Sequence, residues 1–225
     1  MSPILRRILQ LLALVALQAF LLFFSAGTIR WSNAWWYLGL YLGMLVVASL
    51  VIIPHRPEVI AERAKGVEGG KSWDRLITRL IAIPSLGFLI LAGLDERFGW
   101  CPPLPLWIIV PGAALFILGY AVVLWAMYSN QYFAQVVRIQ TERGHTAVSG
   151  GPYHFIRHPG YAGMLISFLG SVFMLDTLYG LIPFLLYAIL VITRTSLEDR
   201  TLQAELPGYA DYARRTRYRL LSGVW

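Results

Sequence analysis

The chain has 225 residues, of which 57% are hydrophobic and only 14% are charged, and its mean hydropathy is +0.61. This composition is too apolar for a soluble domain of that size. The formal net charge of +7 comes from basic residues between apolar blocks, not from a basic groove on a soluble domain, so we expect no nucleic-acid partner. The single cysteine, Cys101, excludes an internal disulfide and a metal site built on thiolates, and we expect no bound metal.

Six apolar segments follow one another along the chain. Four of them are long enough to cross a hydrocarbon core of ~30 Å as helices rising about 1.5 Å per residue; they cover residues 8–27, 34–54, 76–94 and 104–128. Two shorter runs, 160–175 and 177–193, are separated by Asp176 and predict a short helical hairpin. The sequence therefore predicts an all-α integral membrane protein of about six transmembrane helices, which forms a single membrane domain over residues 1–225.

Basic residues predict the orientation of these helices. With six spans, all but two of the 19 lysines and arginines fall on the side that holds both termini, and only Arg30 and Arg97 remain for the other side. Under the positive-inside rule this side is cytoplasmic. The first span follows Arg6 and Arg7 as a signal peptide would, but its apolar core is too long, so we interpret it as a signal anchor. We expect a multi-pass protein of a bacterial inner membrane.

The stretch from Ser149 to Gly163 joins a long polar loop to the fifth span. Within it Gly150, Gly151 and Pro152 predict a turn, and Pro159 predicts that a helix begins at about His158 or Pro159. Arg157 and His158 then stand at a helix N-terminus, where a cation is disfavoured by about 0.3–1 kcal/mol. We interpret this as a site for an anion held by Arg157 and free backbone N–H groups; the alternative is that Arg157 extends to lipid headgroups.

The segment after Thr193 carries Arg194, Glu198 and Asp199 in helical spacing. A hairpin returns the chain to the same membrane face, so we expect residues 158–161 to lie near residues 194–199. Arg194 and Glu198 are also four residues apart, which suits a simple surface ion pair. A pocket of arginine, carboxylate and aromatic side chains would suit a zwitterionic ligand that carries a further cation.

These motifs resemble the isoprenylcysteine carboxyl methyltransferase family, whose wider relatives include phospholipid methyltransferases. The resemblance rests on Gly151-Pro152-Tyr153, Arg157-His158-Pro159-Gly160-Tyr161 with Gly163, Glu198-Asp199 and Tyr209-x-x-Tyr212. It covers the chain from about residue 130 to the C-terminus. It implies an enzyme that moves a methyl group from S-adenosyl-L-methionine to a lipophilic acceptor in the lipid bilayer. We therefore expect a methyltransferase core over residues 101–225 and N-terminal helices, residues 1–100, with an accessory or substrate-side role.

The resemblance also implies site residues, in a cytoplasmic loop and C-terminal helix that form the cofactor site. The catalytic residues would be Arg157 and Glu198. The cofactor-binding residues would be Gln140, Gly151, Pro152, Tyr153, Arg157, His158, Pro159, Tyr161, Gly163, Glu198 and Asp199. The substrate-binding residues would be Asn130, Arg194 and Tyr212. Asp199 stands where the family usually has glutamate, which shortens the reach of this acid.

The acceptor is left open by the sequence. It could be the carboxylate of a prenylcysteine-like substrate, which needs little acid–base machinery. A phospholipid or small-molecule amine would arrive protonated and need a base, for which His145, His154 and His158 are candidates. An S-methyltransferase is a further alternative. A protein from another functional class, a non-catalytic membrane scaffold or lipid-binding protein, would retain the same helices without turnover.

Overall fold

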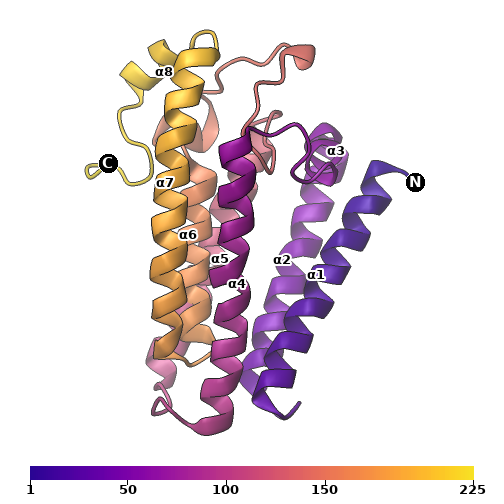
Figure 1. Ribbon diagram of the computed structural model, residues 1–225, viewed down its shortest axis with the longest axis vertical. Helices are drawn as coiled ribbons and strands as arrows, with labels where there is room; N and C mark the ends of the chain where they lie inside the picture. The colour runs from indigo at the N-terminus through magenta and orange to yellow at the C-terminus, as the bar shows by residue number, and fades with distance from the viewer.

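The computed structural model describes all 225 residues, and its secondary structure is helical throughout. The helices are α1 (Pro3–Ala26), α2 (Ser32–His55), α3 (Pro57–Ala64), α4 (Ser72–Phe98), α5 (Leu106–Ser129), α6 (Pro159–Met174), α7 (Leu181–Glu205) and α8 (Tyr209–Arg215). Short 3-10 turns lie at Thr141–Arg143, Gly151–His154 and Leu178–Gly180. Six helices, α1, α2 and α4 to α7, run side by side in alternating directions (Figure 1).

Length and composition make five of these helices able to cross a membrane, namely α1, α2, α4, α5 and α7. Their outer faces expose large apolar side chains such as Phe24, Trp36 and Leu50, as lipid-facing helices do. The prediction of an all-helical integral membrane protein is thus confirmed. The predicted hairpin differs in one respect: α6 is short, with 16 residues, but α7 has 25. The apolar run ends at Thr193, whereas the helix continues through the amphipathic segment as far as Glu205.

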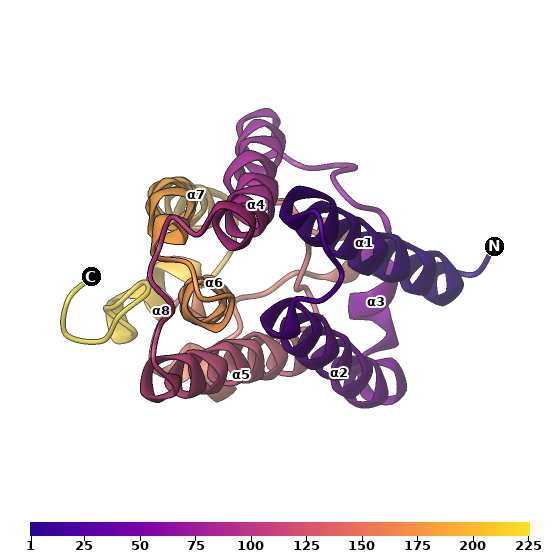
Figure 2. The same cartoon turned by 90° about the horizontal axis from the view of Figure 1, so that it is seen from below.

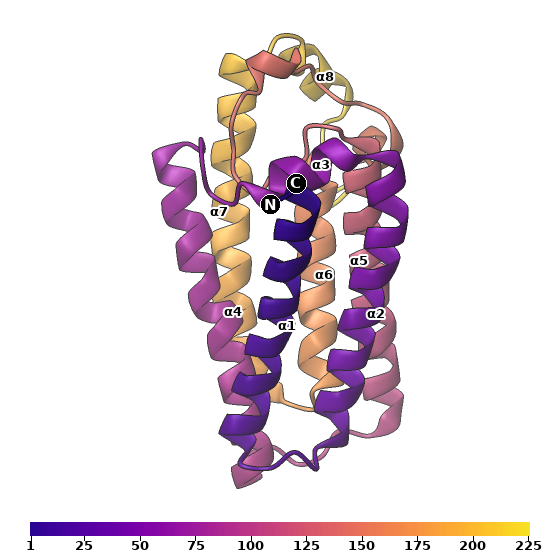
Figure 3. The same cartoon turned by 90° about the vertical axis from the view of Figure 1, so that its right-hand side faces the viewer.

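Both termini lie toward one end of the bundle, which we call the polar end (Figures 1 and 3). It carries α3, α8 and the loop of residues 130–158 between α5 and α6. Viewed along its axis, α6 lies between α5 and α7, and α1 and α2 lie on the far side of the bundle from α7 (Figure 2). The largest buried apolar cluster includes Leu22, Tyr37, Phe88, Phe116 and Val172, and so joins the first three long helices to α5 and α6.

Glycines bring α5 and α6 into backbone contact. A Cβ atom added to Gly119 would collide with the backbone of Ser167 and the carbonyl of Gly163, and one added to Gly170 would collide with the backbone of Phe116 and with the carbonyl of Gly112. Small residues allow such close approach between membrane helices, where van der Waals packing replaces the hydrophobic effect. This contact fixes the position of the N-terminus of α6, where the predicted motif begins: α6 starts at Pro159 with His158 as its cap, as predicted.

Candidate active site

A cavity of about 300 Å³ lies at the polar end; we call it the polar cavity. Its wall is formed by α6, α7, α8 and the segment of residues 130–158, with Arg63 of α3 and two residues of α4, Thr78 and Ile81. Eight of the predicted site residues line it: Asn130, Tyr153, Arg157, His158, Tyr161, Arg194, Glu198 and Tyr212. The structure therefore brings together side chains from four separate parts of the sequence. The volume is in the range of ~300–1,000 Å³ typical of pockets for small molecules.

Glu198 presents a carboxylate to this cavity that has no cationic partner. It accepts a short hydrogen bond from the Tyr161 hydroxyl, and this is the only hydrogen bond of its side chain. The predicted surface pair between Arg194 and Glu198 is wrong, because Arg194 turns inward and binds Asp74 on α4. A half-buried carboxylate without a counter-ion is well suited to a cationic ligand.

The pair of Asp74 and Arg194 holds one wall of the cavity. Arg194 donates to both oxygens of Asp74, at 2.7 and 3.1 Å, and both side chains are buried. Asp74 Oδ2 also accepts from the amide of Val137 at 2.7 Å, and Arg194 Nη2 donates to the carbonyl of Gln135 at 2.7 Å. These contacts fix residues 135–137 against α4 and α7. From the sequence alone Asp74 was not predicted as the partner of Arg194, although an acidic residue in the first turn of a membrane helix is a recognisable candidate for an ion pair.

The anion beside Arg157 is part of the protein itself. Arg157 makes a bidentate pair with Asp199, with Nε and Nη2 at 2.8 and 2.9 Å from the two carboxylate oxygens. Its Nη1 donates to the carbonyls of Thr216 and Arg217, each at 3.0 Å. From the sequence we expected a bound ligand to supply this anion, and Asp199 supplies it instead. The alternative that Arg157 extends to lipid headgroups is wrong, because the side chain is buried and fully engaged.

Asp199 joins α7 to the C-terminal segment. Its carboxylate is inaccessible to solvent and accepts hydrogen bonds from five side chains: Arg157, His158, Gln203, Tyr209 and Arg219. The backbone adds two further links, from the amides of Arg157 and His158 to the carbonyls of Tyr218 and Arg219. The residues after α8 are thereby held against the N-terminus of α6, next to the cavity.

Aromatic rings form much of the remaining wall. The ring of Tyr161 is stacked on His158, with centroids 5.8 Å apart, and the Arg194 guanidinium lies 5.2 Å from its centroid. Tyr212 donates to the carbonyl of Tyr153 at 2.7 Å. Burial raises the pKa of the Tyr153 and Tyr212 phenols, so both stay neutral at physiological pH. Tyr209, which belongs to the C-terminal motif but was not predicted as a site residue, also lines the cavity.

Six predicted cofactor-binding residues lie behind the cavity wall and do not line it: Gln140, Gly151, Pro152, Pro159, Gly163 and Asp199. Gln140 is buried and donates to the Tyr132 carbonyl at 2.7 Å, which shapes the loop. Gly151 has φ +59°, and a Cβ atom there would collide with Ser129. Gly163 belongs to the α5–α6 contact. Their positions indicate that these residues shape the wall through backbone conformation and packing.

His145 packs on this wall as a neutral ring. Its centroid lies 4.2 Å from that of Tyr132, and its Nδ1 faces the amide of Gln140 at 3.3 Å. Burial and the neighbouring guanidinium groups of Arg143 and Arg138 lower the pKa of His145 to about 4. The imidazole is therefore uncharged at neutral pH and accepts the hydrogen bond from Gln140.

Comparison with known proteins gives a family match over the segment that builds this site. Residues 112–204, from α5 to the end of α7, match the model of the isoprenylcysteine carboxyl methyltransferase (ICMT) family. A probable protein-S-isoprenylcysteine O-methyltransferase of Oryza sativa subsp. japonica is 29% identical over 133 residues, which are 58% of this chain and 69% of the relative. The cobalt-zinc-cadmium resistance protein CzcN of Cupriavidus metallidurans is 33% identical over 119 residues, 52% of this chain and 49% of the relative. The motifs of α6 and α7 thus lie in a segment that is similar to the isoprenylcysteine carboxyl methyltransferase family, within an all-helical membrane fold.

Proposed function

We propose that the protein transfers the methyl group of S-adenosyl-L-methionine to the carboxylate of a prenylcysteine-like acceptor, and that the polar end of the bundle faces the cytoplasm. The observation that carries the proposal is the carboxylate of Glu198, which faces the polar cavity without a counter-ion beside neutral aromatic rings. The family match over residues 112–204 and the name of the rice relative support the reaction and the acceptor class.

The residues of the polar cavity fit this cofactor. Glu198 is placed to bind an ammonium group, and the faces of Tyr153 and Tyr161 would attract a sulfonium by about 0.5–2 kcal/mol. Gly160 also lines the cavity at the first turn of α6, where backbone N–H groups favour a carboxylate. Arg157 acts in this proposal as a positioning residue, because its guanidinium is engaged by Asp199. When bound, the cofactor supplies an electrophilic methyl group on sulfur.

A second cavity, of about 490 Å³, supports a lipophilic acceptor; we call it the apolar cavity. Its lining is mostly hydrophobic and comes from all the helices from α1 to α7, and it includes Tyr37, Phe88 and Phe116. The two cavities share Arg63, Gln135 and Met164 in their walls. In this arrangement the N-terminal helices form the substrate side of the enzyme, and an apolar chain there would place its headgroup beside the polar cavity.

Methyl transfer to a carboxylate requires little acid–base catalysis. Displacement at a methyl group requires that donor and acceptor be aligned and that water be excluded, and alignment alone can supply roughly 7–11 kcal/mol of the barrier. The protein meets this requirement with rigid walls: the Asp74–Arg194 pair fixes residues 135–137, and the Asp199 contacts fix the C-terminal segment.

Calorimetric titration of the detergent-purified protein with S-adenosyl-L-methionine tests the cofactor site. We expect the wild type to bind and Glu198→Gln to bind at least tenfold more weakly, because the amide keeps the shape but loses the charge. Glu205→Gln is the matched control: Glu205 lies on the same helix but pairs with Lys71 at the surface, so binding should not change. Absence of binding by the wild type would overturn the proposal.

A further inference from the structure

Arg63 is a half-buried arginine without an acidic partner. It lies on α3 and lines both the polar and the apolar cavity. It makes none of the ion pairs and side-chain hydrogen bonds of the structure, and its one specific contact is the face of the Phe133 ring, 5.4 Å from its Cζ to the centroid. Burial and the charges of Arg7 and Arg194 lower its pKa to about 9, so it remains charged at neutral pH.

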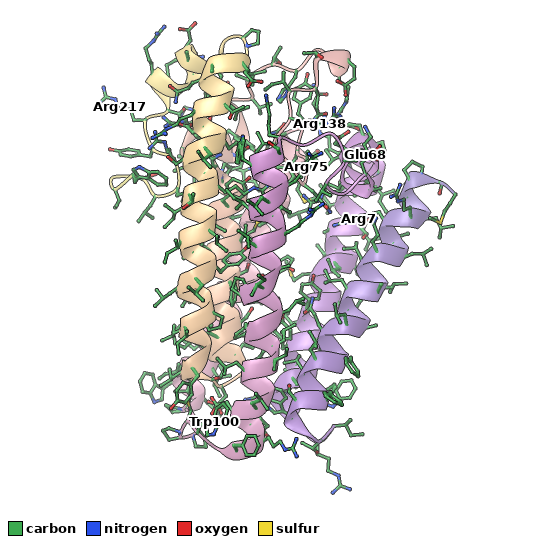
Figure 4. The ribbon with its side chains drawn as sticks, viewed as in Figure 1. Arg7, Glu68, Arg75, Trp100, Arg138 and Arg217 are labelled. Carbon is green, nitrogen blue, oxygen red and sulfur yellow. The ribbon has the colours of Figure 1, made fainter.

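The charges around Arg63 do not balance. Arg7 of α1 lines the apolar cavity and donates only to Gln10, at 3.3 Å; it lies at the same end of the bundle as Arg138 (Figure 4). The charge of Arg194 is matched by Asp74. The nearest acid on the same helix, Glu62, forms ion pairs with Arg138 and Lys65.

Two guanidinium groups therefore line the apolar cavity without an anion, and one of them, Arg63, lies at the junction of the two cavities. A charge removed from bulk water is costly unless it is paired, and a guanidinium presents a fork of donors that matches a carboxylate or a phosphate. Beyond this junction the walls of the apolar cavity are mostly hydrophobic and include Leu11, Met44 and Phe88. The junction thus combines a recognition element for an anion with space for an apolar chain.

We infer that Arg63 and Arg7 bind the anionic headgroup, a carboxylate or a phosphate, of a single-chain amphiphile whose apolar chain occupies the apolar cavity. Identifying this amphiphile as the methyl acceptor rests on the proposed function; the anion site itself does not. Both arginines lie outside the segment that matches the family model. Residues 1–100 would then supply acceptor specificity, and residues from α5 onward would supply the cofactor site.

The test compares amphiphiles that differ in charge but not in chain. Purified protein in an uncharged detergent is titrated with palmitate, hexadecyl phosphate and hexadecanol, and binding is followed by calorimetry. We expect the wild type to bind at least one of the two anions tenfold or more tightly than the alcohol, and the preferred anion distinguishes a carboxylate site from a phosphate site. In Arg63→Gln this preference should disappear. Arg75→Gln is the control, because Arg75 is exposed at the same end and lines neither cavity (Figure 4).

Two results would overturn the inference: a wild type that does not prefer either anion, or an Arg63→Gln variant that keeps the wild-type preference. Titration of the wild type with S-adenosyl-L-methionine separates this inference from the proposed function. Thermal unfolding of Arg63→Gln close to the wild-type Tm shows that the variant is folded. A protein that binds the anion but not the cofactor would refute the proposed function and leave the anion site standing.

Discussion

Replacing Asp199 with asparagine should lower the free energy of unfolding more than an equally small substitution at the protein surface. The amide keeps the shape of the side chain but leaves Arg157, which is buried, without its counter-ion. Removing one partner of a buried ion pair costs about 3–5 kcal/mol. Arg219, the other cation that contacts this carboxylate, is 26% exposed and can be solvated in part. We therefore expect the loss of unfolding free energy to lie near the lower limit of this range.

The assay is thermal unfolding of the purified protein in detergent. For a chain of this size 1 kcal/mol shifts Tm by about 2–4 °C, so a loss of about 3 kcal/mol predicts a decrease in Tm of about 6–12 °C. Asp211→Asn is the control, because its pair with Arg214 is exposed and such pairs contribute about 0–1 kcal/mol. The double variant with Arg157→Gln should lose less than the sum of the single changes, since neither charge is then left alone. Equal effects of the Asp199 and Asp211 changes would refute this reasoning.

Two further predictions concern packing and pH. Gly119→Ala should lower the free energy of unfolding by about 1–3 kcal/mol, because the added methyl group meets backbone atoms of α6 that cannot move aside. Gly39 faces open space, so Gly39→Ala should leave stability unchanged. Unfolding curves with the same Tm for the two variants would contradict this. The folded-state pKa of His145 lies near 4, below its ordinary value of 6.5, so the stability gained from its neutral form is complete above pH 6.5 and is lost as the pH falls toward 4. Tm measured between pH 8 and pH 5 should therefore decrease less in His145→Gln than in the wild type, and identical pH profiles would exclude this role for His145.

The helices could be predicted from the sequence because membrane helices are specified by local composition. Uninterrupted apolar runs gave the long spans, and Pro159 gave the start of α6. The apolar run alone did not give the end of α7, because an amphipathic segment continues the helix; the helical spacing of Arg194, Glu198 and Asp199 indicated this continuation. Hydropathy reports where a chain can enter the bilayer, and it does not report where its helix stops.

The partners of charged side chains depend on tertiary contacts and were harder to predict. The hairpin argument correctly brought Arg157 and Glu198 to one cavity. The i,i+4 spacing suggested Glu198 as a partner of Arg194, whereas the true partner, Asp74, is 120 residues away in sequence. The cations at the N-terminus of α6 suggested a bound anion, which Asp199 supplies instead. Arg63 gave no signal, since a basic residue in an amphipathic segment looks like an ordinary surface position.

The most direct test of the account is transfer of a labelled methyl group by the purified protein. The protein is incubated with methyl-labelled S-adenosyl-L-methionine and S-farnesylcysteine, and the products are separated and treated with mild base, which hydrolyses methyl esters. We expect base-labile label on the acceptor with the wild type, and little or none with Glu198→Gln. A wild-type protein that binds both molecules but leaves the carboxylate unlabelled, or that labels it at a base-stable position, would contradict it.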